Sequence, residues 1–211
     1  HRIAAMRYAW ENGSYFSRWL PDLAFGYGYP FFVYREPGPL YAILGPHLLG
    51  LPMAAGSNLF YALTILAAGW FMFLWVRDVA GARAGFVSAA AYMAAPDLLL
   101  DALVRGNAPE SMALPLFPFL LWMGRRWMIK GTAGPFLLSI LSLALLSLSH
   151  NISTLIFALT LLVYLLAIGL INHLSWKPLL GRLALLFVLG LGITFFYTGG
   201  ALLEMDQVTL S

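Results

Sequence analysis

Long apolar stretches separated by short polar segments dominate the sequence from residue 57 onward. None of them contains Asp, Glu, Lys or Arg, and they cover residues 57–76, 84–95, 111–124, 135–149, 152–171 and 183–203. A bilayer core about 30 Å thick needs roughly 20 mostly apolar residues in a helix, fewer where the bilayer thins. The pattern therefore predicts six membrane-spanning helices and an all-α, polytopic transmembrane bundle. The second and third stretches are short, and prolines follow the second and lie within the third. Such prolines are compatible with a membrane helix because neighbouring helices can satisfy the backbone groups that a proline leaves without a hydrogen bond.

The first 56 residues do not show this pattern. Within 1–12, Ile3, Met6 and Trp10 share one helical face, which predicts an amphipathic helix lying in the membrane interface. Residues 14–38 follow with many aromatic side chains, glycines and prolines. Aromatic side chains at this density are typical of the lipid headgroup level.

The stretch 40–51 is apolar but has only 12 residues, which reach about 18 Å as a helix. We interpret it as an interfacial or re-entrant helix, so that residues 1–56 form an external region. If it crosses instead, residues 1–37 move to the cytoplasm with half of the candidate site. The expected divisions are the external region, a six-helix region at 57–203, and the start of an external segment at 204–211 of a longer chain.

Composition agrees with a membrane protein. Of the 211 residues, 61% are hydrophobic and 10% are charged, and the mean hydropathy is +0.82. A soluble domain carries about 25% charged residues, and disordered chains carry more charge and less apolar surface. Nucleic-acid binding needs clustered, exposed Lys and Arg side chains. Here the basic residues lie scattered between apolar stretches, so this function is excluded. The absence of cysteine excludes disulfides, thiolate nucleophiles and cysteine-type zinc sites.

Charge alternates from one connecting loop to the next. Every second loop is basic, and these loops contain a single acid, Asp78. Their basic residues are Arg77, Arg83, Arg125, Arg126, Lys130, Lys177 and Arg182. The positive-inside rule places these loops in the cytoplasm. The carboxylate-rich loops then face outside, and so does the candidate site.

The external loop 97–110 holds the densest charge. If it is helical, Asp97, Asp101 and Arg105 lie on one face, and Glu110 opens the next helix. Arg105 is suited to bidentate binding of a phosphate, while the carboxylates orient it, take a proton or bind a divalent ion. The alternative is a solvated loop with local ion pairs.

Further candidates lie in two other external segments. His150, between two apolar helices, is placed to donate to a phosphate or to steer a proton. In the aromatic loop, Asp22 and Arg35, with Arg18 and Glu36, suit a ligand that combines a sugar ring with a phosphate. The alternatives are a polar turn for His150, and charges that only contact water and headgroups for the loop.

Familiar catalytic signatures are absent. The sequence contains no P-loop, dinucleotide fingerprint, HExxH or GxSxG motif. The four histidines, His1, His47, His150 and His173, are too scattered to form a metal cluster.

Several short motifs carry a resemblance. Residues 19–32, WLPDLAFGYGYPFF, and 37–41, PGPLY, resemble the first external loop of GT-C-type membrane glycosyltransferases. Among these, the chain is most similar to bacterial polytopic membrane proteins labelled "6-pyruvoyl-tetrahydropterin synthase-related". VRGNAPE at 104–110 resembles their second external loop, and SHN at 149–151 resembles the turn that opens a later helix pair.

The resemblance implies a fold and an activity. GT-C enzymes have a conserved transmembrane module with interfacial helices in a long first external loop. They transfer a sugar from a polyprenyl-phosphate carrier to an acceptor on the outer face, and an acid just after the first helix usually serves as general base. His1 resembles the histidine that follows this acid. The resemblance therefore implies that the first helix and the base lie upstream of the fragment.

Together these observations predict a membrane glycosyltransferase of the bacterial plasma membrane that uses a lipid-linked sugar donor, contacts membrane lipids and binds no nucleic acid. The catalytic candidates are Asp22 and Glu110, and the donor-phosphate candidates are Arg105, His150 and Arg35. Asp97 and Asp101 are candidates for orienting Arg105 or for a divalent metal ion, the one cofactor that the carboxylates suggest. The acceptor is unknown. One alternative is a non-catalytic GT-C-like scaffold or binding subunit. Another is a transporter or flippase, but the charges lie at the ends of the helices and not in their middles, which disfavours transport.

Overall fold

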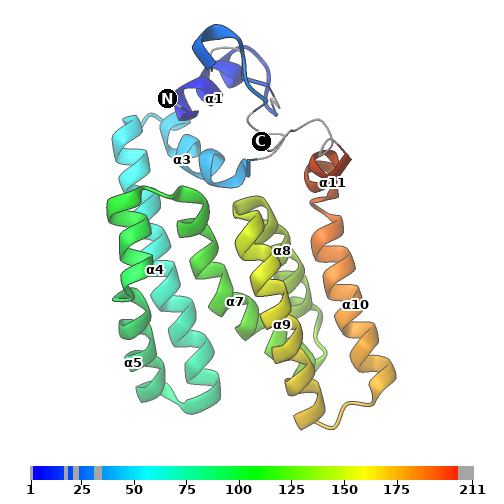
Figure 1. Cartoon of the computed structure of the whole chain (residues 1–211). Helices are drawn as coiled ribbons and strands as arrows, with labels where there is room; N and C mark the ends of the chain where they lie inside the picture. The colour runs from blue at the N-terminus through cyan, green and yellow to red at the C-terminus, as the bar shows by residue number, and fades with distance from the viewer. Residues whose placement is uncertain (1, 17–18, 21–23, 31–34, 204–211) are drawn as a thin grey trace.

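The structure, a computed structural model, describes residues 2–16, 19–20, 24–30 and 35–203 and is helical throughout most of them (Figure 1). The all-α expectation is confirmed for these residues, in which extended pairing is limited to one bridge between Leu20 and Tyr29. The elements are α1 (Arg2–Glu11), η1 (Ala24–Gly26), α3 (Gly38–Leu48), α4 (Met53–Ala80), α5 (Ala82–Met93), α6 (Pro96–Leu99), the π-helical η2 (Leu100–Arg105), α7 (Ala108–Lys130), α8 (Ala133–Ser149), α9 (Asn151–Ile171), α10 (Trp176–Gly192) and α11 (Phe195–Leu203).

Two helices of the described chain, α4 and α9, are long and apolar enough to cross a membrane. A third candidate is α5 together with α6 and η2, which are bent by 47° at Pro96 and pass the same test as a pair. The chain is therefore an all-helical membrane protein with two or three candidate spans among the described residues. The predicted spans 111–124 and 135–149 lie inside α7 and α8, and their crossing stays a prediction.

The sixth predicted span is wrong as a single helix. The helix begins earlier than expected, at Trp176, and ends at Gly192, and a turn at 193–194 separates it from α11. Thr194 is fully buried in this turn. Its Oγ1 donates to Ser147 Oγ at 3.1 Å and is 2.9 Å from the carbonyl oxygen of Leu191. Such side-chain bonds compete with helical ones and interrupt the helix.

The longer helices lie side by side, and α1 and α3 lie across one end of them (Figure 1). Helix α4 packs against α5 and α7, and α8 packs against α7 and α10. Helix α3 contacts the ends of α4, α7 and α8, and α1 packs on α3. The apolar face of α1 buries Met6 and Ala9 against Leu44 of α3. The short apolar stretch that begins at residue 40 thus lies in α3, across the end of the bundle. A stretch of this length is too short to cross the bilayer core as a helix.

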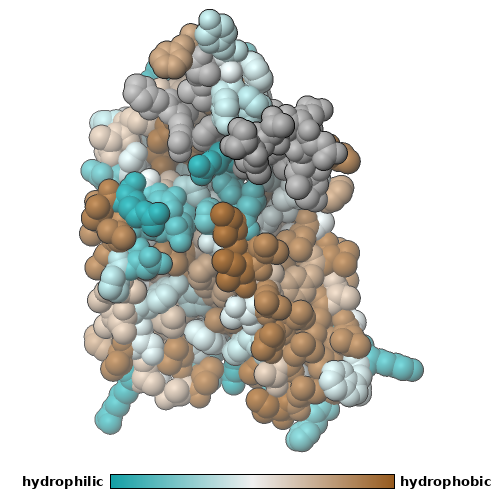
Figure 2. Space-filling view, in the orientation of Figure 1, coloured by the Kyte–Doolittle hydropathy of each residue, from teal (hydrophilic) through white to brown (hydrophobic). Residues whose placement is uncertain are grey.

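The main core lies between α7, α8, α9 and α10, where leucines such as Leu120, Leu143 and Leu161 are fully buried. Close approach depends on small residues: a Cβ added at Gly190 would lie 2.7 Å from Leu143 Cδ2. Other large apolar side chains point outward, including Leu155 and Ile156 of α9. Figure 2 shows a continuous hydrophobic surface on this side of the molecule. A surface of that kind is suited to lipid rather than to water.

Candidate functional site

A cavity of about 720 Å³ lies at the end of the bundle that α1 and α3 cover, and we call it the end cavity. Hydrophilic side chains gather near this end in Figure 2. Its walls come from α1, the segment before α3, α3, the first turns of α4, the end of η2 and the loop into α7. The lining residues are Ile3, Arg35, Glu36, Leu40, Ile43, Ser57, Tyr61, Arg105, Gly106, Asn107, Ala108, Pro109 and His150.

The three donor-phosphate candidates all line the end cavity. Arg35 precedes α3, Arg105 ends η2, and His150 precedes α9, so they come from distant parts of the sequence. Alternating loop charge predicted that they lie on one side of the membrane, and the fold brings them to one cavity. Two guanidinium groups and an imidazole that line one cavity favour an anionic ligand.

Arg105 is positioned by a buried carboxylate. Its Nη1 donates to Asp101 Oδ1 at 2.9 Å, and Asp101 is completely buried while the Arg105 side chain is 54% exposed. Gly106 then ends η2 in a left-handed conformation with φ 60°. The predicted local ion pair therefore exists, and the same arginine also faces the cavity. The pair holds one edge of the guanidinium and leaves its other N–H groups for a ligand.

Asp97, the third member of the predicted Asp97–Asp101–Arg105 face, takes no part in the ion pair of the other two. Asp97 is exposed and makes no ion pair with a described residue. Residues 100–105 wind as a π-helix, and Asp101 and Arg105 remain paired within it. The negative charge of Asp97 contributes to the raised pKa of Glu110, and its shared face with Asp101 stays a prediction.

Behind Arg105, Asp101 meets Glu110 in the first turn of α7. The Oδ2 atom of Asp101 is buried and accepts no hydrogen bond from a described donor. Burial raises the pKa of Glu110 above 4.5, and the nearby carboxylates of Asp101 and Asp97 raise it further, against a lowering by Arg105. These neighbouring carboxylates therefore favour the protonated form of Glu110.

Glu110 does not line the cavity itself. Its Oε2 accepts a hydrogen bond from Asn107 Nδ2 at 2.8 Å, and Asn107 lines the cavity. Glu110 is thus connected to the cavity wall through one amide side chain. Its predicted catalytic role stays a prediction.

His150 caps α9 with its ring. Its Nδ1 accepts from the backbone N–H of Ser153 at 3.4 Å and lies 2.7 Å from Ser153 Oγ. Because a backbone N–H only donates, Nδ1 is an acceptor, and the proton of the neutral ring is on Nε2. That tautomer supplies a donor from the ring nitrogen that the cap leaves unused.

Glu36, which the sequence suggested as a ligand-binding residue, makes a contact between segments that the sequence did not reveal. It is buried at the cavity wall, and its Oε1 accepts from the backbone N–H of Asn151 at 2.7 Å. This bond joins the segment before α3 to the N-terminus of α9, where a carboxylate is favoured by the helix dipole. Its Oε2 is buried without a hydrogen bond to any described group. The one signal in the sequence was its position next to Arg35.

Two other predictions find no geometry in the structure. Asp22 lies outside the described residues. Within the described part of the chain, no group of three or more His, Asp or Glu side chains is arranged to hold a metal ion. The structure therefore offers no described site for the divalent ion suggested for Asp97 and Asp101.

Comparisons with protein-family models, with curated proteins and with solved structures found no match to this chain.

Proposed function

We propose that this chain belongs to a membrane glycosyltransferase that takes its sugar from a polyprenyl-phosphate donor and transfers it at the outer membrane face. The observation that supports this most is the convergence of Arg35, Arg105 and His150 on the end cavity. Three cationic or hydrogen-donating groups from separate segments suit a phosphate better than they suit a neutral ligand.

The position of the cavity supports a lipid-linked phosphate. Ser57 and Tyr61, in the first turns of the candidate span α4, form part of its wall. In the proposed placement, the cavity lies where this apolar helix emerges toward the headgroup level. A phosphate there can be bound while its prenyl chain stays between lipid-facing helices.

Transfer requires a cation at the leaving phosphate and a proton acceptor at the attacking hydroxyl. In the proposed reaction the acceptor oxygen attacks the anomeric carbon of the sugar, and the bond from that carbon to the phosphate oxygen breaks. The lipid phosphate keeps the bonding electron pair and is stabilised by Arg105 and Arg35. The proton of the hydroxyl passes to the general-base acid that the GT-C resemblance implies, because Asn107 separates Glu110 from the cavity.

Binding and transfer are tested separately in the full-length protein. The probes are polyprenyl phosphate and the same polyprenol without phosphate, and the assays are native mass spectrometry in detergent and sugar transfer in liposomes. His150→Asn keeps an acceptor for the α9 cap but loses the imidazole donor. Arg105→Lys keeps charge but loses the planar fork. Arg83→Lys, an exposed position outside the cavity, is the matched control.

We expect phosphate-dependent binding that both cavity variants weaken and the control leaves unchanged. Equal binding of the phosphate and the alcohol would contradict the proposal. Phosphate-dependent binding without any transfer would instead support a non-catalytic binding subunit with the same cavity.

A further inference from the structure

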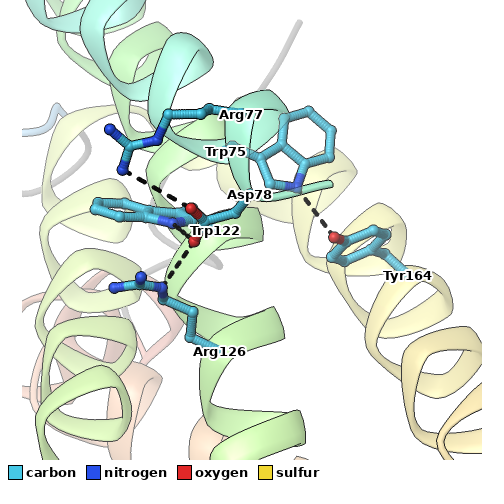
Figure 3. A network of polar contacts seen from close by, with 6 residues as sticks. All are labelled: Trp75, Arg77, Asp78, Trp122, Arg126 and Tyr164. Atoms are coloured by element: carbon cyan, nitrogen blue, oxygen red, sulfur yellow. Dashed lines mark hydrogen bonds and ion pairs between the residues drawn. The ribbon is translucent and has the colours of Figure 1, made fainter. Parts of the chain in front are cut away.

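A second polar cluster lies near the far end of α4 from the end cavity. Asp78 on α4 accepts hydrogen bonds through Oδ2 from Trp122 Nε1 at 2.7 Å and Arg126 Nε at 2.8 Å, both on α7 (Figure 3). Arg77 Nη2 lies 3.8 Å from the other carboxylate oxygen, Oδ1. One carboxylate thus fixes two arginines and a tryptophan where α4 and α7 meet.

This cluster borders a pocket of about 320 Å³, which we call the basic pocket, lined by Asp78, Arg125, Arg126, Ile129 and Lys130. Three cations face one carboxylate, whose oxygens are already engaged. Arg125 and Lys130 make no ion pair or hydrogen bond with any residue that the structure describes. The pocket therefore has an excess of positive charge that is not neutralised within the described chain.

We propose that the basic pocket binds the phosphate of an anionic phospholipid headgroup. Its depth in the membrane fits this ligand. Ser57, at the end cavity, and Asp78, at the basic pocket, are 21 residues apart on one helix. That spacing corresponds to about 30 Å, the thickness of the bilayer core. When the end cavity is at one headgroup layer, the basic pocket is at the other.

The walls also suit a lipid. Arg126 lies over the Trp122 ring, 4.9 Å from its centroid, so packing as well as the Asp78 bond holds the guanidinium in place. Tryptophan is typical of the membrane interface, and Ile129 adds an apolar wall beside the cations. Basic pockets between membrane helices on the cytoplasmic side are known receptors for anionic headgroups. This inference depends on the membrane placement of α4 and not on the proposed function.

The test measures lipid binding to the full-length protein in detergent by native mass spectrometry. The probes are phosphatidylglycerol, phosphatidylcholine and the water-soluble glycerol 1-phosphate. The pocket variant is Arg125→Ala with Lys130→Ala. The matched control, Arg83→Ala with Lys177→Ala, removes the same charge from exposed positions outside the pocket.

We expect the Kd for phosphatidylglycerol to rise about five-fold for each removed pocket charge, or about 25-fold in the pocket variant. The control should change it less than about two-fold, and phosphatidylcholine should bind weakly to all forms. Equal losses in both variants would show that a diffuse charge field, not a pocket, attracts the lipid. Glycerol 1-phosphate binding as tightly as the lipid would assign the pocket to a free phosphate and overturn the lipid proposal. If the alanine variant fails to fold in a melting test, Arg125→Gln with Lys130→Gln is measured with the same expectations.

Discussion

Replacing Arg105 by lysine separates its two contacts, the bond to Asp101 and the proposed bond to phosphate. Arg105 Nη1 is 2.9 Å from Asp101 Oδ1, and more than half of the arginine side chain is exposed at the end cavity. A lysine keeps the charge and retains a donor for Asp101. It cannot keep one edge on Asp101 while it presents a second, planar edge to a phosphate.

The expected magnitudes differ between activity and stability. A charge-assisted hydrogen bond contributes about 1.5–3 kcal/mol. Its loss in the transition state lowers transfer roughly 10- to 150-fold. Because Arg105 is largely exposed, solvent screens the ion pair, and Arg105→Lys should lower the free energy of unfolding by at most about 1 kcal/mol. Arg105→Ala leaves the buried Asp101 carboxylate without its cation, which should cost about 1–3 kcal/mol.

The measurements are sugar transfer in liposomes and thermal melting in detergent for Arg105→Lys, Arg105→Ala and Arg83→Lys. The result that supports the reasoning is a large loss of transfer in Arg105→Lys with near-normal stability. Normal transfer in Arg105→Lys combined with unstable Arg105→Ala would assign Arg105 a structural role through Asp101. Full transfer in Arg105→Ala would remove Arg105 from the site.

Three further predictions concern the same end of the molecule. Because the raised pKa of Glu110 makes the folded chain bind this proton more tightly than the unfolded chain, the free energy of unfolding should fall as pH rises from about 4.5 through the raised pKa. Melting curves across pH should lose this slope in Glu110→Gln, and an unchanged slope would contradict the assignment. Glu36→Gln replaces a charge-assisted bond to Asn151 by a neutral one and should lower the free energy of unfolding by about 1 kcal/mol, measured by chemical denaturation. Gly106→Ala should lower the free energy of unfolding by about 1–2 kcal/mol because of the φ of 60° at this residue. Steric crowding should add nothing, since the new Cβ would lie 3.7 Å from the Tyr61 hydroxyl, an ordinary contact. A stability equal to wild type would exclude the left-handed cap.

Hydropathy predicted the helical class because a stretch such as 152–171 leaves few alternatives to a helix in an apolar environment. It did not predict the break between α10 and α11. That break depends on Thr194 and Ser147, which are 47 residues apart and meet through tertiary packing. A hydroxyl inside an apolar run carries no periodic signal, so sequence reasoning extended the helix through it.

The candidate site was partly accessible to sequence reasoning. Loop charge grouped Arg35, Arg105 and His150 on one side because membrane topology limits where each loop can be. Tyr61 was not recognised because it lies within an apolar stretch, where a hydroxyl at a cavity wall looks like any other lipid-facing or packed aromatic residue. The π-helix at residues 100–105 was not predicted, because a π-helix is not visible in a pattern of residue types.

The two arginine–aspartate pairs show why we place chemistry at one end of the bundle and lipid anchoring at the other. At the end cavity, Asp101 is fully buried, holds Arg105 through one oxygen and has a second oxygen without a described donor beside Glu110. In the basic pocket, both oxygens of Asp78 are close to donors. Its Oδ2 accepts two hydrogen bonds, and its Oδ1 lies near Arg77. The first carboxylate positions a cation beside a neighbour, Glu110, whose pKa it raises, and the second only positions cations. We therefore place the proposed proton transfer near the end cavity, while the excess charge of the basic pocket suits a ligand that is held and not converted.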